Sequence, residues 1–218
     1  MDRKIPDVTI ERLPAYLRIL DELREDEIEI VSSAEMGRRT GFSSEQIRKD
    51  LAYFGAFGTR GVGYEVVSLQ DKLKSILALA NQVPIVLVGA GSLGRALARY
   101  NRLHQQHLDL VGIFDNDLEK VGTSIAGVEV YHVREMGDFI REEGVRLAVV
   151  AVPKEAAQQT VDSLDQNGIR AILNFAPSHL QTSSDVVVKT VDLTSHLQSL
   201  AYYTQDPQES ITGEPGDD

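Results

Sequence analysis

Apolar residues in the first third of the chain recur with the spacing of helices. A first helix is expected over residues 9–26, and the positions on its apolar face are Ile10, Leu13, Leu17 and Leu20. Pro14 lies inside this segment and marks a kink or a late start of the helix. Farther along, the segment 70–82 has a helical pattern and is expected to be a linker helix.

Two short helices are expected between these segments, because each has its own start signal. Ser32 is an N-cap with Glu35 at the capping-box position, and Ser43 with Gln46 repeats this arrangement. Gly41 lies between them as the residue that ends the first of the two helices. Two capped helices joined by a tight turn are the local organisation of a helix-turn-helix.

The second short helix, expected over 44–54, carries two cations on its polar side. Its apolar positions, spaced i, i+4 and i+7, are Ile47, Leu51 and Phe54. Arg48 and Lys49 therefore point outward near its N-terminal half, where recognition helices read bases in the major groove. An arginine there can bind guanine O6 and N7 together. For an isolated helix, the alternative is that the two cations form a solvated face.

A glycine-rich segment follows this helix. The sequence FGAFGTRGVGYEVV (54–67) places aromatic and β-branched residues between glycines, which predicts a β-hairpin with Arg60 at its tip. A single arginine on such a wing suits the narrow minor groove, where the negative potential is strongest. The alternative is a structural hairpin with an incidental arginine. Together with the two capped helices, the hairpin favours a winged helix-turn-helix that binds DNA.

The middle of the chain carries a phosphate-binding pattern between a strand and a helix. The apolar strand 84–88 leads into GAGSLG, which is followed by a helical segment. In this context Gly89 permits the tight turn, Gly91 lets the backbone approach a pyrophosphate, and Gly94 lets the helix pack on the strand. The helix N-terminus supplies N–H groups and positive potential for the phosphates. The remaining residues of the expected pyrophosphate site are Ala90, Ser92 and Leu93.

The next strand, 109–115, ends in a carboxylate. Asp115 stands 21 residues after Gly94, where a carboxylate accepts hydrogen bonds from the adenosine ribose and repels a 2′-phosphate. NAD(H) is therefore expected rather than NADP(H), with Asn116 beside it in the site. The alternative is that Asp115 only caps the following turn.

Buried strands then alternate with amphipathic helices. This order predicts an α/β fold with a parallel, doubly wound sheet, whose ligands bind at the carboxyl ends of the strands. The further strands are expected at 128–133, 147–153, 171–177 and 186–192. The nicotinamide half of the dinucleotide is expected near two of these strand ends, at Val152, Pro153, Asn174, Phe175, Ala176 and Pro177.

The net charge of −11 on 218 residues argues against a nucleic-acid partner until its distribution is considered. Residues 206–218 carry five acids and no bases. This tail also contains Pro, Gly and Ser and is expected to be disordered. Residues 36–64, by contrast, hold five basic and two acidic residues. A locally positive surface is therefore expected within an acidic protein.

Missing residue types exclude several classes of site. The chain has no cysteine, which excludes disulfides, Cys-ligated zinc and thiol chemistry. Its five histidines stand in no metal-ligand pattern such as HExxH, so we expect no metal. The apolar runs are too short for a membrane span or a signal peptide, so a cytoplasmic protein without a membrane partner is expected.

Nothing in the sequence indicates catalysis. No GxSxG elbow is present, and little chain remains after the sheet to build a substrate site. The expectation is a sensor that binds a dinucleotide without turning it over, not an enzyme. Two alternatives stay open: an NAD-dependent oxidoreductase with a helical N-terminal extension, and a CoA-binding domain like those of acyl-CoA ligases.

These motifs, taken in order, resemble the Rex family of redox-sensing transcriptional repressors over about residues 5–204. The similar segments are QIRKDLAYFGAFGTRGVGY, VLVGAGSLGRAL, VPKEAAQ, ILNFAP and VDLTSHLQSLAYY. The resemblance implies a homodimer on a palindromic operator in double-stranded DNA, with NAD⁺ compatible with binding and NADH releasing the repressor. It implies DNA contacts from Arg48, Lys49 and Arg60, with Ser43, Ser44 and Gln46 completing the surface.

The resemblance also implies a domain map and a switch. It implies a DNA-binding domain over 1–80, an NAD(H)-binding Rossmann domain over 81–192, a domain-swapped dimer helix over 193–204 and an acidic tail over 205–218. The implied contacts of the swapped helix are Leu193, Leu197 and Leu200. The implied redox switch exchanges a Tyr100–Asp192′ contact for an Arg18–Asp192′ contact, where the prime marks the partner subunit. Leu193 replaces an aromatic residue that some members place beside the nicotinamide.

Overall fold

The computed structural model describes residues 5–55, 58–59, 61–104, 107–183 and 185–204. The chain divides into two compact units, residues 1–82 and 83–218, and each is described by itself. Of the predicted features, Arg60 and the tail 205–218 lie outside the described residues.

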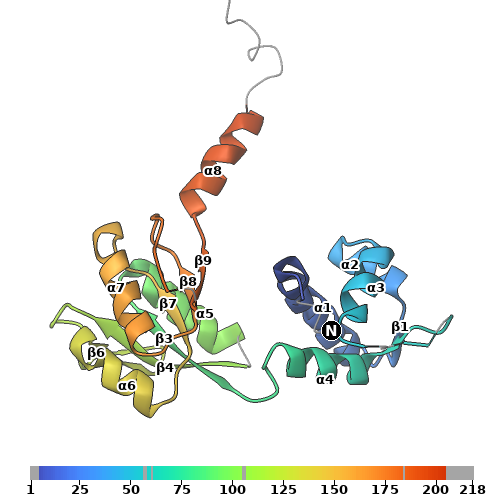
Figure 1. Cartoon of the computed structure of the whole chain (residues 1–218), viewed down its shortest axis with the longest axis horizontal. Coiled ribbons are helices and arrows are strands. Elements are labelled where there is room, and N and C mark those ends of the chain that lie inside the picture. The colour runs from blue at the N-terminus through green and yellow to red at the C-terminus, as the bar shows by residue number, and fades with distance from the viewer. Residues whose placement is uncertain (1–4, 56–57, 60, 105–106, 184, 205–218) are drawn as a thin grey trace, which may run out of the picture. The chain divides into compact units, whose positions relative to one another are not determined.

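The first unit is built from four helices and a two-stranded sheet. Its elements are α1 (Asp7–Glu25), β1 (Ile30–Val31), α2 (Ser33–Thr40), α3 (Ser44–Ala52), β2 (Tyr64–Glu65) and α4 (Val66–Ile76) (Figure 1). β1 and β2 pair antiparallel, with Ile30 opposite Glu65. Side chains from all four helices meet in one core, including Leu13, Leu20, Met36, Ile47, Leu51, Leu69 and Leu73.

The first helix differs from its expected pattern at two places. It begins at Asp7 and continues through Pro14, so the proline does not mark a late start. Pro14 lies on the exposed side, where water can satisfy the backbone carbonyl that its ring leaves without a donor. Ile10 is 37% exposed, and Thr9 is buried in its place. The buried face is therefore rotated by one residue at its start.

The segment expected as a linker helix belongs to the core of the first unit. α4 begins at Val66 rather than at residue 70, and Val66, Leu69 and Leu73 are buried in the core shared with α1. The strand pairing in the glycine-rich segment also differs from the expected β-hairpin. β2 pairs with β1, which precedes α2, whereas Thr59 and Gly63 form a single isolated bridge that closes a tight turn.

The second unit is a seven-stranded sheet with the order β5-β6-β4-β3-β7-β8-β9. The strands are β3 (Val83–Val88), β4 (Leu108–Asp115), β5 (Ser124–Ile125), β6 (Val128–His132), β7 (Leu147–Val150), β8 (Ala171–Asn174) and β9 (Val187–Thr190). All pairs are parallel except the short edge pair β5–β6. Without β5, the order is the doubly wound Rossmann order, and its switch point lies between β3 and β7.

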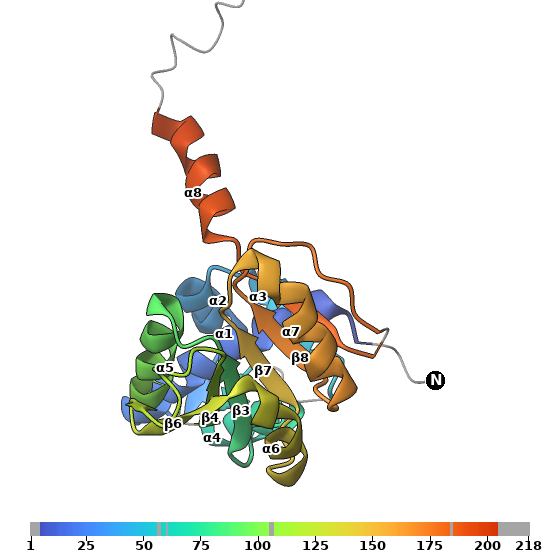
Figure 2. The ribbon, with the colours of Figure 1, turned by 90° about the vertical axis from the view of Figure 1, so that its left-hand side faces the viewer.

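Helices cover both faces of this sheet, as the alternating pattern predicts. They are α5 (Ser92–His104), the 3₁₀ turn η1 (Val133–Glu135), α6 (Met136–Glu142) and α7 (Lys154–Gln166). Val86 and Val88 of β3 pack in the core that contains residues of α6 and α7, whereas Ile85 and Leu87 pack in the core with α5. Figure 2 shows α5 and α7 on opposite sides of the sheet. The predicted fold class is confirmed.

The last described elements are α8 (Leu193–Ala201) and the 3₁₀ turn η2 (Tyr202–Thr204). None of their residues is buried. Among the described helices, none combines the length and the apolarity that a membrane crossing requires.

Candidate functional site

The glycine-rich turn joins β3 to α5 at the switch point of the sheet. Gly89 has φ +105°, and a Cβ there would lie 2.4 Å from the carbonyl oxygen of Ala151, the residue that directly follows β7. A Cβ on Gly94 would lie 1.8 Å from the oxygen of Gly89. Both glycines are therefore required by the packing of the turn itself.

Gly91 is different, because a Cβ there would meet no atom within 4 Å. Nothing in the described chain requires a glycine at this position, whereas a ligand that approaches the backbone closely would. Gly91, Ser92 and Leu93 are exposed at the start of α5. Ala90 is buried, and its carbonyl accepts a hydrogen bond from Arg95 Nε at 3.2 Å. The open side of the turn lies at a helix N-terminus, which suits a pyrophosphate.

Asp115, the last residue of β4, is hydrogen-bonded to the glycine-rich turn. Its Oδ2 accepts the N–H of Ala90 at 2.7 Å, and its Oδ1 accepts the N–H of Asp117 at 2.9 Å. Lys120 Nζ lies 3.2 Å from Oδ2. Burial alone would raise the pKa of Asp115, but the backbone N–H groups of Asp117 and Ala90 and the Lys120 ammonium outweigh it and lower the pKa. Asp115 is therefore an ionised acceptor beside the glycine turn.

A cavity of about 730 Å³ opens beside Asp115 at the carboxyl ends of β3, β4 and β7. Gly89, Gly91, Asp115 and Asn116 line it with Val152 and Pro153, so the predicted pyrophosphate, ribose and β7-end positions share one cavity. Its walls also include apolar residues that suit a flat base, namely Val88, Val133, Met136 and Ala151. The arrangement fits the adenosine and phosphate part of a dinucleotide.

Sequence reasoning missed six polar residues of this cavity. They are Lys120, His132, Arg134, Gln159, Thr160 and Ser163. A signal existed for His132, since its Nδ1 caps η1 and Glu135 accepts its backbone N–H in a capping box. No signal singled out Lys120, because its five-residue distance from Asp115 matters only once the turn after β4 has formed.

The predicted residues at the end of β8 do not line this cavity. Asn174 is buried, and its side chain binds both backbone groups of Ala176 at 2.9 Å and lies 3.3 Å from Thr190 Oγ1. Asn174 therefore shapes the NFAP turn and joins it to β9. This turn lies next to the end of β7, since the N–H of Phe175 donates to the carbonyl of Val150 at 2.9 Å.

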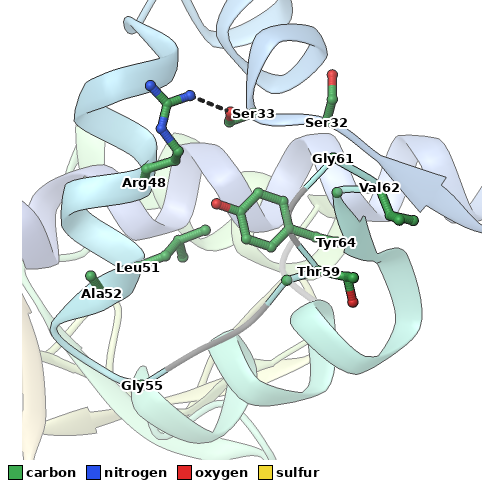
Figure 3. A pocket seen from close by; sticks show the side chains of 12 residues that line it. Ser32, Ser33, Arg48, Leu51, Ala52, Gly55, Thr59, Gly61, Val62 and Tyr64 are labelled. Atoms are coloured by element: carbon green, nitrogen blue, oxygen red, sulfur yellow. Dashed lines mark hydrogen bonds between the residues drawn. The ribbon is translucent and has the colours of Figure 1, made fainter.

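The candidate DNA surface lies on α3 and the turn before β2. Ser43 caps α3 by accepting the N–H of Gln46 at 3.1 Å, and Ser44 is its first residue. Arg48 and Lys49 are both exposed. Arg48 Nη1 donates to Ser33 Oγ at 3.0 Å, so its guanidinium lies at the start of α2, as Figure 3 shows.

A groove of about 530 Å³ separates α3 from the glycine-rich turn. Arg48, Ser33 and Tyr64 line it, together with Thr59 and Val62 (Figure 3). Burial raises the pKa of the Tyr64 hydroxyl, against the opposing charge of Arg48, so this hydroxyl stays a neutral donor. With Ser32 included, the groove thus presents a cation and four hydroxyl side chains to a polyanion.

Asp50 fixes α3 from behind, a role that the sequence did not reveal. It is almost fully buried, and its carboxylate accepts Arg12 Nε at 2.6 Å and Tyr16 Oη at 2.7 Å from α1. Thr9 Oγ1 and Gln46 Nε2 also donate to it. Gln46, predicted as a DNA contact, is thus bound to Asp50 within α3.

The three residues of the implied switch do not come together within one unit. Arg18 is exposed on α1 in the first unit, whereas Tyr100 is 56% exposed on α5 in the second. Asp192 caps α8, since its Oδ1 accepts the N–H of Ser195 at 2.9 Å. On α8 itself, Leu193, Leu197 and Leu200 are 55%, 68% and 59% exposed.

Two family models match the chain. A model described as "Putative DNA-binding protein N-terminus" matches residues 4–52, and a "CoA binding domain" model matches residues 80–178. A protein named redox-sensing transcriptional repressor Rex from Natranaerobius thermophilus is 47% identical and covers 92% of each chain. One of the same name from Roseiflexus sp. is 45% identical over 93% of each chain.

The fold of the chain is also similar to that of solved structures. RSP in complex with β-NAD⁺ and operator DNA matches with a TM-score of 0.85 at 37% identity and covers 93% of each chain. RSP in complex with β-NADH matches with a TM-score of 0.80 at 35% identity, covering 93% of this chain and 95% of that one. The relatives bear the names of regulators and not of enzymes.

Proposed function

The chain belongs to the Rex family of redox-sensing transcriptional repressors, and from this premise we propose which of its residues read the dinucleotide and which read DNA. Its function is NADH-responsive repression through DNA binding, and the ligands that it senses are NADH and NAD⁺. One observation carries this conclusion: the chain matches, over 93% of its length, a Rex-family repressor solved with β-NAD⁺ and operator DNA.

The dinucleotide is assigned to the Rossmann domain, residues 81–192. The pyrophosphate lies against Gly89–Gly94, the adenosine ribose donates to Asp115 beside Asn116, and the nicotinamide half extends past Val152 and Pro153 toward the 174–177 turn. The open side of Gly91 and the ionised, hydrogen-bonded Asp115 carboxylate support this placement. Asn174 shapes this last turn through its two hydrogen bonds to the backbone of Ala176.

Operator DNA is assigned to the winged domain, residues 1–80. Arg48 and Lys49 approach the major groove from α3, and Arg60 is assigned to the minor groove. Ser43, Ser44 and Gln46 complete the surface at the start of α3. The exposure of both cations and the groove beside Arg48 support this assignment.

The working molecule is a cytoplasmic homodimer held by residues 193–204. The exposed leucines of α8 support this, because such an apolar stripe is more stable when another surface covers it. A two-fold dimer presents two winged domains and therefore calls for a palindromic operator. Asp192, at the start of α8, would contact Tyr100 in one state and Arg18 in the other across the dimer.

The signal acts through differential affinity. The oxidised nicotinamide ring is planar and positively charged, whereas the reduced ring is neutral and puckered. A ligand shifts a two-state dimer only by the difference in its affinity for the two states. A coupling of about 1–3 kcal/mol would change operator affinity roughly 5–150-fold. NADH is assigned to the state in which the two winged domains no longer match the operator half-sites.

An operator titration tests the proposal. Fluorescence anisotropy of a labelled palindromic operator is measured with the unaltered protein at increasing NADH and, separately, NAD⁺. We expect NADH to release the DNA and NAD⁺ to leave it bound. Equal effects of the two dinucleotides would refute the sensor. Oxidation of NADH by the protein with a carbonyl compound would instead support an NAD-dependent oxidoreductase with a helical extension.

A further inference from the structure

The loop after β4 places a lysine against the carboxylate assigned to the ribose. Lys120 Nζ lies 3.2 Å from Asp115 Oδ2 and 3.4 Å from Asp117 Oδ2. Its side chain is 27% exposed and lines the dinucleotide cavity. Lys120 is therefore held between two carboxylates at the wall of the cavity where the ribose hydroxyls would approach.

A second cation lines the same cavity from η1. Arg134 is exposed and lines the cavity with Asp115 and Lys120. Counted with Asp117, this part of the site holds two carboxylates and two cations. A 2′-hydroxyl adds no charge to this set, whereas a 2′-phosphate adds about −1.5 to −2 at neutral pH. That phosphate would stand beside the buried Asp115 carboxylate, with which Lys120 is already paired.

We propose that Lys120 is a specificity-determining residue of this site, and that its pairing with Asp115 decides between a 2′-hydroxyl and a 2′-phosphate. Paired, Lys120 holds Asp115 as an acceptor for ribose hydroxyls. Released from Asp115, Lys120 joins Arg134 as a ligand for a 2′-phosphate. A single neutral substitution at Asp115 therefore exposes a latent NADP(H) site. This inference rests on the proposed dinucleotide site.

The test measures NADH and NADPH binding by calorimetry for the unaltered chain and a set of full-length variants. In Asp115→Asn, the amide oxygen can still accept a backbone N–H of the turn. We expect this variant to bind NADPH about tenfold tighter than the unaltered chain does, since a charge-assisted hydrogen bond replaces a repulsion. The double variant Asp115→Asn/Lys120→Met should lose about that factor again. The control Asp115→Asn/Lys72→Met removes an exposed lysine of α4 and should keep the gain.

A variant that keeps Asp115 tests the inference even if the Asp115→Asn chains fail to fold. Lys120→Met alone should weaken NADPH binding more than NADH binding, so that the ratio of the two dissociation constants rises several-fold. An unchanged ratio, or equal NADPH affinity of the Asp115→Asn chain with and without Lys120, would overturn the inference. A different result, no NADH binding by the unaltered chain, would contradict the proposed function itself.

Discussion

A single buried carboxylate holds the helix that carries the two cations proposed to read DNA. Asp50 on α3 accepts hydrogen bonds from Arg12 and Tyr16 on α1, and its ion pair with Arg12 is buried on the Asp50 side. Removing one partner of such a pair leaves the other charge without compensation. We expect Asp50→Ala to lower the free energy of unfolding by about 3 kcal/mol, measured by urea denaturation. Glu45→Ala, an exposed acid on the same helix, is the control and should change it by less than about 0.5 kcal/mol.

The same carboxylate predicts a dependence of stability on pH. Burial alone would raise the pKa of Asp50, but hydrogen bonds from Arg12, Tyr16 and Gln46 lower it below its usual value. Asp50 therefore contributes its full stabilisation above the pKa of an unfolded aspartate, about 3.9. This stabilisation is lost as the pH falls through the lower pKa of Asp50 in the folded chain. The stability difference between the unaltered chain and Asp50→Asn should shrink when urea unfolding is repeated below about pH 4. A difference that stays constant would contradict this account.

Single residues also show why one part of the site could be predicted and another could not. Gly89, Gly94 and Asp115 were identifiable because a strand, a turn and a helix follow one another in the sequence, and this local order fixes what each residue does. The partners of Asp50 lie 34 and 38 residues away, so its role depends on the packing of α1 against α3. Lys120 has the same limitation, since the folded loop brings it to Asp115.

At the scale of elements, the position of α3 makes a prediction for DNA binding. Arg48 and Lys49 are exposed on a helix fixed from behind by Asp50. Replacing either by alanine should cost about 1–3 kcal/mol of operator affinity if it contacts a base, with NADH binding unchanged. Anisotropy titrations at several salt concentrations measure both the loss and the salt dependence.

Lys72→Ala on α4 removes one exposed cation outside the proposed DNA surface and is the matched control. If Lys49→Ala binds the operator as the unaltered chain does, Lys49 belongs to a solvated face and not to the interface.

The elements that the sequence missed are short or paired over a distance. β1 has only two residues, too few to show the alternating pattern of a strand. Its partner β2 follows the whole helix-turn-helix in the sequence, so no local turn signal marks the pair. α4 was expected to be a linker because its apolar positions were counted from residue 70, whereas its buried residues begin at Val66. The strands of the second unit were predictable, since short buried apolar runs alternate with helical segments and several of these runs end near a glycine or a proline.

At the scale of the whole molecule, α8 is the element on which the proposed homodimer depends. Leu193, Leu197 and Leu200 form an exposed stripe, and Tyr202 and Tyr203 beyond them are 66% and 79% exposed. Burial of an apolar side chain contributes about 1.5–3 kcal/mol each. Leu197→Asp/Leu200→Asp should therefore convert the proposed dimer into a monomer, as measured by sedimentation velocity.

The monomer makes a second prediction that separates assembly from folding. Each chain would still bind NADH, because the described residues that line the proposed dinucleotide cavity come from β3, β4, β6, η1, α6, α7 and the loops after β3, β4 and β7, and none comes from α8. Operator affinity would fall steeply, since a lone winged domain contacts one half-site and loses the gain in effective concentration from the linked second one. Gln198→Asp places one such negative charge on α8 away from the leucine stripe and should leave the proposed dimer intact. A Leu197→Asp/Leu200→Asp chain that still sediments as a dimer would place the interface elsewhere on the molecule.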